Sequence, residues 1–163
     1  MKAGTGGWQT VSPSTLTFNP EDDAPAGLDA EEIHRLVQSF GSAARRAREA
    51  GYQVLEIHSA HGYLIHQFLS PLSNQRTDAY GGPFENRIRF LTEVVKNVKS
   101  EWPDELPLFV RISVTDWAEG GWNPEEAVRL VRILKQEGVD LIDCSSGGLV
   151  PWQKIPPGPG YQV

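Results

Sequence analysis

Three short apolar segments of strand length alternate with three amphipathic segments of helical length along most of this chain. The predicted helices span about residues 30–50, 84–100 and 124–137, and the predicted strands span 54–57, 108–112 and 139–144. Apolar residues recur every three or four positions in the helical segments, whereas the strand segments are short continuous apolar runs. This alternation is typical of a parallel sheet whose faces are covered by helices. The sequence therefore predicts an α/β fold.

Local signals mark where two of these helices begin and end. Asp29 stands where it can cap the first helix, and Glu32 follows three residues later, where it can reach back to the cap. Gly51 is a typical helix stop. Asn123 and Pro124 open the third helix in the order expected for a cap and the first helical residue.

Two architectures are built from such units, the open doubly wound sheet and the closed (β/α)8 barrel. The glycine-rich phosphate fingerprints of the open class, G-x-G-x-x-G and G-x-x-x-x-G-K-[ST], do not occur in the sequence. A whole barrel needs eight strands and about 250 residues. Residues 156–163 are rich in Pro and Gly and contain no returning helix. We therefore expect part of a TIM barrel with about three βα units and parallel strands.

The domain organisation follows from the same pattern. Residues 1–27 are rich in Gly, Pro, Ser and Thr without helical or strand periodicity, so we expect a loop-rich lead-in. Residues 28–163 carry the βα units. The whole chain, residues 1–163, is predicted to be one incomplete barrel domain.

Charge and hydropathy exclude several classes of protein. The 163 residues carry a formal net charge of −6 with scattered Lys and Arg, so we expect no nucleic-acid partner. No apolar run reaches the roughly 18 residues of a membrane span, and residues 1–7 lack the apolar stretch of a signal peptide. The single cysteine, Cys144, cannot form an internal disulfide. A cytoplasmic protein with no membrane partner is expected.

Polar residues at the carboxyl ends of the predicted strands are the first candidates for a site, because catalytic groups of parallel α/β folds gather there. They are His58, Arg111 and Ser145. His61 and Tyr63 follow His58 by three and five residues, on the turn that leaves the strand. Two neutral imidazoles can hold one oxygen atom and stabilise negative charge on it, and a phenol can act as a general acid.

Each candidate also has a simpler interpretation. The two histidines could be structural hydrogen-bonding groups, or with His66 they could hold zinc, although the helical H-E-x-x-H placement is missing. His66 is expected to serve packing or the surface. Arg111 would pair with Glu56 or Asp143 on a neighbouring strand, or it would contact an anionic or electron-rich cofactor edge. Cys144 is expected to be a small buried apolar residue.

Long stretches with fixed spacing resemble the old yellow enzyme family, which are FMN-dependent NAD(P)H:flavin oxidoreductases and ene-reductases built on a TIM barrel. The matching stretches are Glu56–Leu64, Phe68–Asn74, Arg76–Gly82, Glu85–Arg87, Phe109–Ser113 and Leu141–Gly147. The pair of histidines resembles the bacterial NADPH-dehydrogenase branch more than the branch with a His/Asn pair. Pro83 stands where the family usually has serine.

The resemblance implies a role for each candidate residue. His58 and His61 would bind the carbonyl oxygen of an activated alkene, or a phenolate, above the flavin. Tyr63 would be the proton donor. Arg111 would contact the flavin ring near its N1 and C2 oxygen. The loop at residues 70–86 is expected to be structural, and the phosphate of FMN is expected to be bound outside this chain.

The predicted activity is hydride transfer from NAD(P)H through FMN to the activated C=C bond of α,β-unsaturated carbonyl compounds. The chain would be a fragment that carries the clamp for the substrate oxygen, and no metal site is expected. At full length the sequence allows a homo-oligomer. Two alternatives stay open: a metal-dependent TIM-barrel hydrolase that uses His58 and His61, and a non-catalytic truncated barrel piece.

Overall fold

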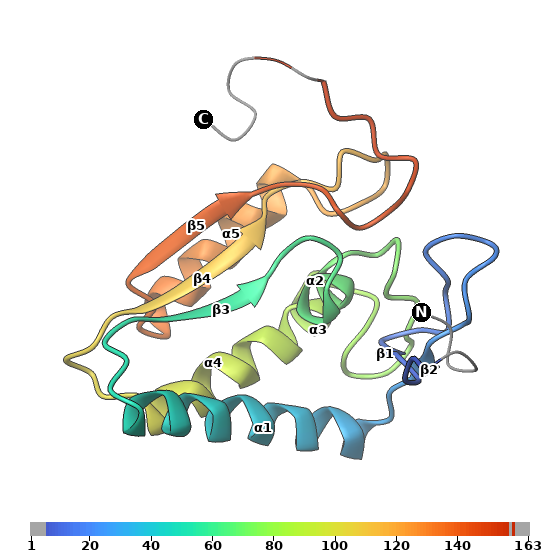
Figure 1. The fold of residues 1–163 in the computed structure, drawn as a ribbon. Helices are drawn as coiled ribbons and strands as arrows, with labels where there is room; N and C mark the ends of the chain where they lie inside the picture. Colours follow the sequence, from blue (N-terminus) through green and yellow to red (C-terminus); the bar gives the residue numbers. More distant parts are fainter. Residues whose placement is uncertain (1–5, 157, 159–163) are drawn as a thin grey trace.

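The structure is a computed structural model that describes residues 6–156 and 158 (Figure 1). Its elements, in chain order, are β1 (Val11–Ser12), β2 (Ala26–Gly27), α1 (Ala30–Glu49), β3 (Leu55–Ser59), α2 (Leu64–Leu69), α3 (Phe84–Arg87), α4 (Arg89–Glu101), β4 (Leu108–Ser113), α5 (Pro124–Gln136) and β5 (Leu141–Ser145). Within the described residues, no helix is both long and apolar enough to span a membrane.

The strands β3, β4 and β5 form one parallel sheet in that order. Each crossover contains helices, as the alternation predicts, so the α/β class with parallel strands is confirmed (Figure 1). The register places His58 beside Arg111 and Arg111 beside Asp143. Because side chains of adjacent parallel strands at the same register position point to the same face, these three side chains share one face of the sheet.

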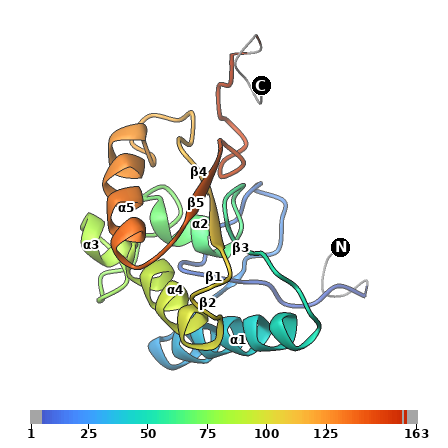
Figure 2. The same ribbon diagram turned by 90° about the vertical axis from the view of Figure 1, so that its left-hand side faces the viewer.

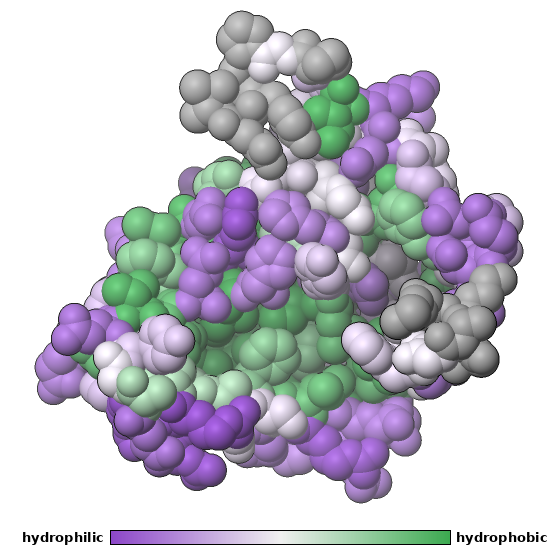
Figure 3. Space-filling view, viewed as in Figure 1, coloured by the Kyte–Doolittle hydropathy of each residue, from purple (hydrophilic) through white to green (hydrophobic). Residues whose placement is uncertain are grey.

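Helices cover only one face of this sheet. In Figure 2 the helices α3, α4 and α5 all lie on one side of the strands. The strand residues that pack against them are fully buried or nearly so: Ile57, Leu108, Val110 and Ile112. The opposite face is open and faces the viewer in Figure 1. In Figure 3 it carries polar side chains over the strands and a hollow with apolar side chains between β3 and α1.

The helix α1 starts at the predicted cap and packs against α4. The Asp29 carboxylate accepts a hydrogen bond from the Glu32 amide at 2.7 Å, and the Glu32 carboxylate accepts one from the Asp29 amide at 2.8 Å. At Gly41 a Cβ atom would lie 2.0 Å from the Asn97 side-chain oxygen. This glycine therefore allows the close crossing of α1 and α4.

Several predicted boundaries differ from the observed ones. Strands β3 and β5 begin later than predicted, and all three strands run one or two residues further at their carboxyl ends, so His58 lies inside β3 rather than after it. The helix predicted over residues 84–100 is interrupted at Ile88, which separates α3 from α4. The lead-in contains a two-residue parallel pair, β1 and β2, that is too short to produce a periodic pattern.

The prediction of a buried Cys144 is wrong, because its side chain is exposed. Cys144 lies on β5, which pairs with β4 on one side and has no further strand beside it among residues 6–156 and 158. The end of the Pro- and Gly-rich stretch, at residues 157 and 159–163, lies outside the described residues.

Candidate active site

The carboxyl end of β3 brings three of the predicted residues together. His58 belongs to β3, and His61 and Tyr63 belong to the turn between β3 and α2. The ring centroids of His58 and His61 are 5.2 Å apart, and those of His58 and Tyr63 are 5.3 Å apart. Tyr63 is 64% exposed, so its hydroxyl is accessible to a ligand. The three rings form one cluster that could contact a single small molecule.

Both histidines have a pKa below the usual value. For His58, burial lowers the pKa most, and the positive charge of Arg111 adds to the effect. For His61, burial is again the largest cause, followed by the proximity of His58 and Arg111. Both imidazoles are therefore neutral at neutral pH, and each has one N–H group to donate.

Arg111 lies beside His58 on the open face, where it forms an ion pair with Asp143. The Arg111 Nε atom is 3.2 Å from Asp143 Oδ2, and the two side chains are 35% and 39% exposed. Of the two partners predicted for Arg111, the structure selects Asp143. The Nε atom is buried but makes no well-directed hydrogen bond to a described residue.

This arginine fits the edge of a flavin. Its guanidinium group has only donors and is partly exposed beside the histidines. A planar ring edge with an electron-rich nitrogen and a carbonyl oxygen would accept those donors. The donor set is therefore suited to FMN.

The turn after β3 has an unusual backbone. His61 has a positive φ of 58°, which a residue with a Cβ atom rarely adopts, and Gly62 follows with a φ of 74°. A Cβ atom on Gly62 would lie 2.1 Å from the Gly148 carbonyl oxygen, and one on Gly148 would lie 2.6 Å from the His61 Cα atom. The turns after β3 and β5 thus touch through their backbones, which only glycine permits.

Two serines at strand ends hold His61. The His61 amide donates to Ser113 Oγ at 3.0 Å, and Ser113 Oγ donates to the Gly147 carbonyl at 2.9 Å. The ring of His61 is bonded as well, since its Nε2 atom is 2.5 Å from Ser145 Oγ. Ser145 was a candidate from its strand-end position, whereas Ser113 was missed because β4 extends one residue beyond its predicted end.

His66 and Asp116 form a second group behind the turn. Both side chains are completely buried, and His66 Nε2 lies 2.8 Å from Asp116 Oδ1. His66 Nδ1 accepts a hydrogen bond from the Gly62 amide at 3.0 Å. Of the two places expected for His66, packing in the interior or the surface, the structure selects the interior. Asp116 follows β4 by three residues, so inspection of the residues just after that strand could have identified it.

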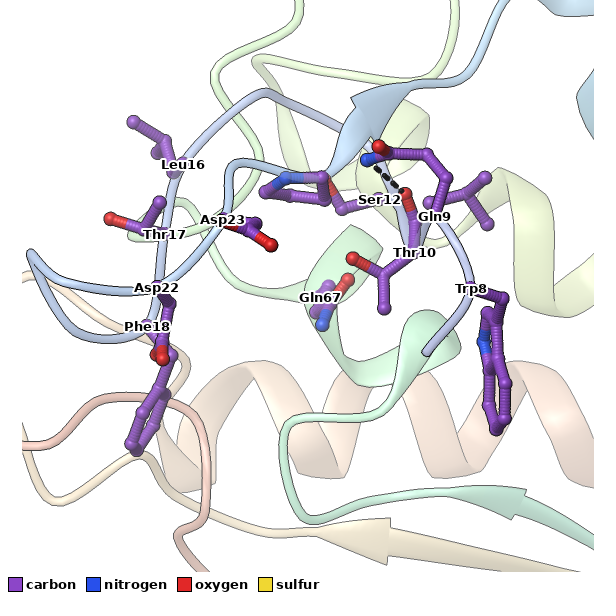
Figure 4. Close-up of a pocket in the computed structure, with 12 residues that line it drawn as sticks. Trp8, Gln9, Thr10, Ser12, Leu16, Thr17, Phe18, Asp22, Asp23 and Gln67 are labelled. Carbon is purple, nitrogen blue, oxygen red and sulfur yellow. Dashed lines mark hydrogen bonds between the residues drawn. The ribbon is translucent and has the colours of Figure 1, made fainter. Parts of the chain in front are cut away.

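Two cavities lie beside the lead-in, and one of them reaches the turn after β3. One, of about 420 Å³, is lined mainly by the lead-in, including Trp8 and Phe18, with Gln67 contributed by α2 (Figure 4). The other, of about 660 Å³, lies between the lead-in, the turn after β3 and residues 149–152. Tyr63 lines this second cavity together with Phe18 and Trp152. His58 and Arg111 lie instead on the open face of the sheet.

Side-chain to backbone hydrogen bonds fix the loop at residues 70–86. The Asn74 side-chain amide donates to the carbonyls of Phe68 and Tyr80 at 2.7 and 2.8 Å. Arg76 donates to the carbonyl of Pro13 in the lead-in and to the carbonyl of Leu28. These contacts agree with the structural role expected for the loop. Pro83 caps α3 without a side-chain hydrogen bond, which a serine at this position could supply.

Residues 6–156 and 158 contain no group of three or more His, Cys, Asp or Glu side chains placed to hold a metal ion. The alternative of a metal-dependent hydrolase thus finds no ligand set in this part of the chain. His66, the third histidine of that alternative, is occupied by Gly62 and Asp116.

Parallel βα units with polar side chains toward the carboxyl ends of their strands are typical of the active-site end of a barrel enzyme. The chain belongs to the NADH:flavin oxidoreductase / NADH oxidase family, whose model matches residues 8–160. This match confirms the family that the sequence resembles, and the printed description of the family names a flavin.

Known proteins support this assignment. The NADPH dehydrogenase of Bacillus subtilis (strain 168) is 51% identical over 152 residues, which cover 93% of this chain and 44% of that protein. An old yellow enzyme homologue from Zymomonas mobilis has a TM-score of 0.79 and 30% identity over 89% of this chain and 44% of its own. Morphinone reductase has a TM-score of 0.75 and 32% identity over 86% of this chain and 43% of its own. The chain thus spans less than half the length of these relatives, and the likeness confirms the prediction of a partial TIM barrel.

Proposed function

We propose that this chain supplies the oxygen clamp and the proton donor of an FMN-dependent reductase of activated alkenes. The observation that carries the proposal is the cluster of His58, His61 and Tyr63 beside Arg111 on the open face of the sheet. The substrate class is an α,β-unsaturated carbonyl compound, and a phenolate would bind in the same place as an inhibitor. NADPH is favoured as reductant by the Bacillus subtilis relative, which is named NADPH dehydrogenase.

In this proposal the two histidines bind the substrate carbonyl oxygen. The proposal uses the tautomer in which Ser145 Oγ donates to His61 Nε2, which puts the ring proton of His61 on Nδ1 for the substrate. His58 donates the second hydrogen bond. Both rings are neutral because of their lowered pKa, so they stabilise the negative charge that grows on the oxygen without themselves being acids at neutral pH.

Arg111 would hold the cofactor and Tyr63 would complete the reaction. When bound and reduced by the nicotinamide, FMN would supply the hydride that is added to the β-carbon. The Arg111 guanidinium would donate to the ring edge on which negative charge collects after reduction. Tyr63 would give its hydroxyl proton to the α-carbon, since an exposed phenol next to His58 can reach a substrate held by the histidines. The second cavity, lined by Phe18 and Trp152, would receive apolar or aromatic substituents of the substrate.

Tyr63→Phe tests this proposal, because it keeps the ring and removes only the proton. In the FMN-loaded protein we expect cyclohex-2-enone to reoxidise the reduced cofactor about 100-fold more slowly, the usual scale of general acid catalysis. Reduction by NADPH and affinity for 4-hydroxybenzaldehyde should change little. Stopped-flow absorbance measures both half-reactions, and a binding titration measures the affinity.

The control is reoxidation by oxygen, which needs no proton on an alkene carbon and should be spared. Equal slowing of both half-reactions would mean that Tyr63 is structural. Unchanged enone reduction would mean that water or another residue supplies the proton.

A further inference from the structure

The buried histidine behind the turn has a defined protonation pattern. A backbone amide can only donate, so the hydrogen bond from the Gly62 N–H requires a lone pair on His66 Nδ1. The remaining ring proton is then on Nε2 and points to Asp116 Oδ1, 2.8 Å away. His66 therefore accepts from the turn on one side and donates to Asp116 on the other.

Asp116 holds His66 in this state. Its carboxylate also accepts hydrogen bonds from Ser70 Oγ at 2.6 Å and from the Trp122 amide at 2.7 Å. Three donors thus converge on a side chain with no exposed surface. Because Asp116 belongs to the connection between β4 and α5, the pair ties this connection to the turn after β3.

The Gly62 amide that His66 contacts is directly linked to His61. The Gly62 N–H belongs to the peptide group that joins His61 to Gly62, so holding it restricts the ψ angle of His61 and the φ angle of Gly62. The Gly62 carbonyl is held too, by Gln67 Nε2 at 2.7 Å. His61 itself has the unfavourable φ of 58°, which persists only where surrounding contacts enforce it.

We infer that His66 and Asp116 are positioning residues, which hold the His61–Gly62 peptide so that His61 and Tyr63 meet the substrate together. The inference rests on the proposed function of His61 and Tyr63. A purely structural histidine would need only to fill its space, whereas here one ring nitrogen bonds the backbone of the proposed oxygen clamp.

Two substitutions of His66 separate positioning from packing. In His66→Asn, the side-chain oxygen falls near the former Nδ1 position and can accept from Gly62, but the side chain is too short to reach Asp116. In His66→Gln, the side-chain amide reaches toward Asp116 but offers no acceptor at the Nδ1 position. Both variants remove the ring from the same buried place, so both should lose stability.

The first measurement is hydrogen exchange of the Gly62 amide in the FMN-loaded protein, followed by NMR. His66→Gln should accelerate this exchange, relative to His66→Asn, by about tenfold, the equivalent of one lost hydrogen bond. The second is affinity for 4-hydroxybenzaldehyde and the rate of cyclohex-2-enone reduction. Both should fall by about tenfold in His66→Gln and be largely rescued in His66→Asn, while NADPH still reduces FMN.

Equal Gly62 exchange in the two variants would overturn the inference. His61→Ala is measured in parallel. If it impairs both ligand affinity and enone reduction, whereas the two His66 variants differ only in Gly62 exchange, the inference is also overturned. If His61→Ala impairs neither, the proposed function has failed, and with it the positioning role. Thermal unfolding of both variants shows whether a loss of activity merely follows a loss of stability.

Discussion

The two faces of the three-stranded sheet are made by alternate residues of the same strands, yet they differ in almost every property. On the helix-covered face, Ile57, Val110 and Ile112 are buried among apolar side chains. On the open face, the neighbouring residues His58 and Arg111 are polar and partly exposed. The strand period of two residues thus separates the groups that stabilise the fold from those that would carry out chemistry.

This separation predicts that substitutions have different consequences on the two faces. Changes on the covered face should reduce stability and affect activity only through unfolding. Changes on the open face and in the turn above it should affect ligand binding and catalysis while the protein stays folded.

The largest effect is expected for Val110→Asp. Val110 is completely buried, and an unpaired carboxylate at this position costs several kcal/mol, enough to unfold a domain of ordinary stability. Circular dichroism and urea denaturation measure the loss. The matched variant Arg111→Gln, on the other face of the same strand, should cost less than about 1 kcal/mol, because its ion pair with Asp143 is partly exposed. Similar losses in both variants would contradict the comparison.

Alanine substitution of either histidine should have the next largest effect, on catalysis and ligand affinity. Each of His58→Ala and His61→Ala removes one hydrogen-bond donor to the developing oxyanion, which costs about 3 kcal/mol, or about 100-fold in the rate of enone reduction. Affinity for 4-hydroxybenzaldehyde should fall with it, while NADPH still reduces FMN. Normal phenolate affinity in both variants would exclude the clamp.

Gly148→Ala should have an intermediate effect, transmitted through the backbone. The added Cβ atom would lie 2.6 Å from the His61 Cα atom, so the turn that carries His61 must shift. We expect a roughly tenfold loss of phenolate affinity, the equivalent of one weakened hydrogen bond. Gly120→Ala is the control, because Gly120 also has a positive φ, of 73°, but has no atom within 4 Å of its added Cβ. Equal losses of affinity in the two variants would mean that strain at a positive φ causes the effect, and not the contact with His61.

The smallest expected effect is the pH dependence of stability. Because the folded-state pKa of His58 and of His61 lies below the ordinary value of 6.5, the unfolded chain takes up protons first as the pH falls. The contribution of these two histidines to stability is therefore complete above pH 6.5, and it is lost as the pH falls toward their folded-state pKa values. Thermal unfolding between about pH 7.5 and 5 should show a decrease of a few degrees, and the double variant His58→Gln/His61→Gln should reduce it.

Local signals in the sequence predicted the helices and the chemical character of the site. The cap at Asp29 and the periodic apolar residues are local in the chain, so α1, α5 and the parallel order of the strands could be predicted without any tertiary contact. The motif after β3 also predicted which residues gather there. The ring cluster of His58, His61 and Tyr63 has the proximity that this prediction requires.

The errors concern features that depend on distant parts of the chain. Cysteine is a residue type that is often buried. The exposure of Cys144 depends instead on what lies beside β5. The strand ends were misplaced because the last residues of each strand are polar. Ser113 and Ser145 are nevertheless buried, since they bond the turn after β3.

The sequence by itself determined the alternation of helices and strands and the identity of the histidine pair, because these depend on periodicity and on local motifs. Only the tertiary structure decided how His61 is held. The contacts that hold it join residues 50 or more positions apart, His66 with Asp116 and His61 with both Ser113 and Ser145. Such contacts arise only when the strands lie side by side, so no local pattern in the chain contains them.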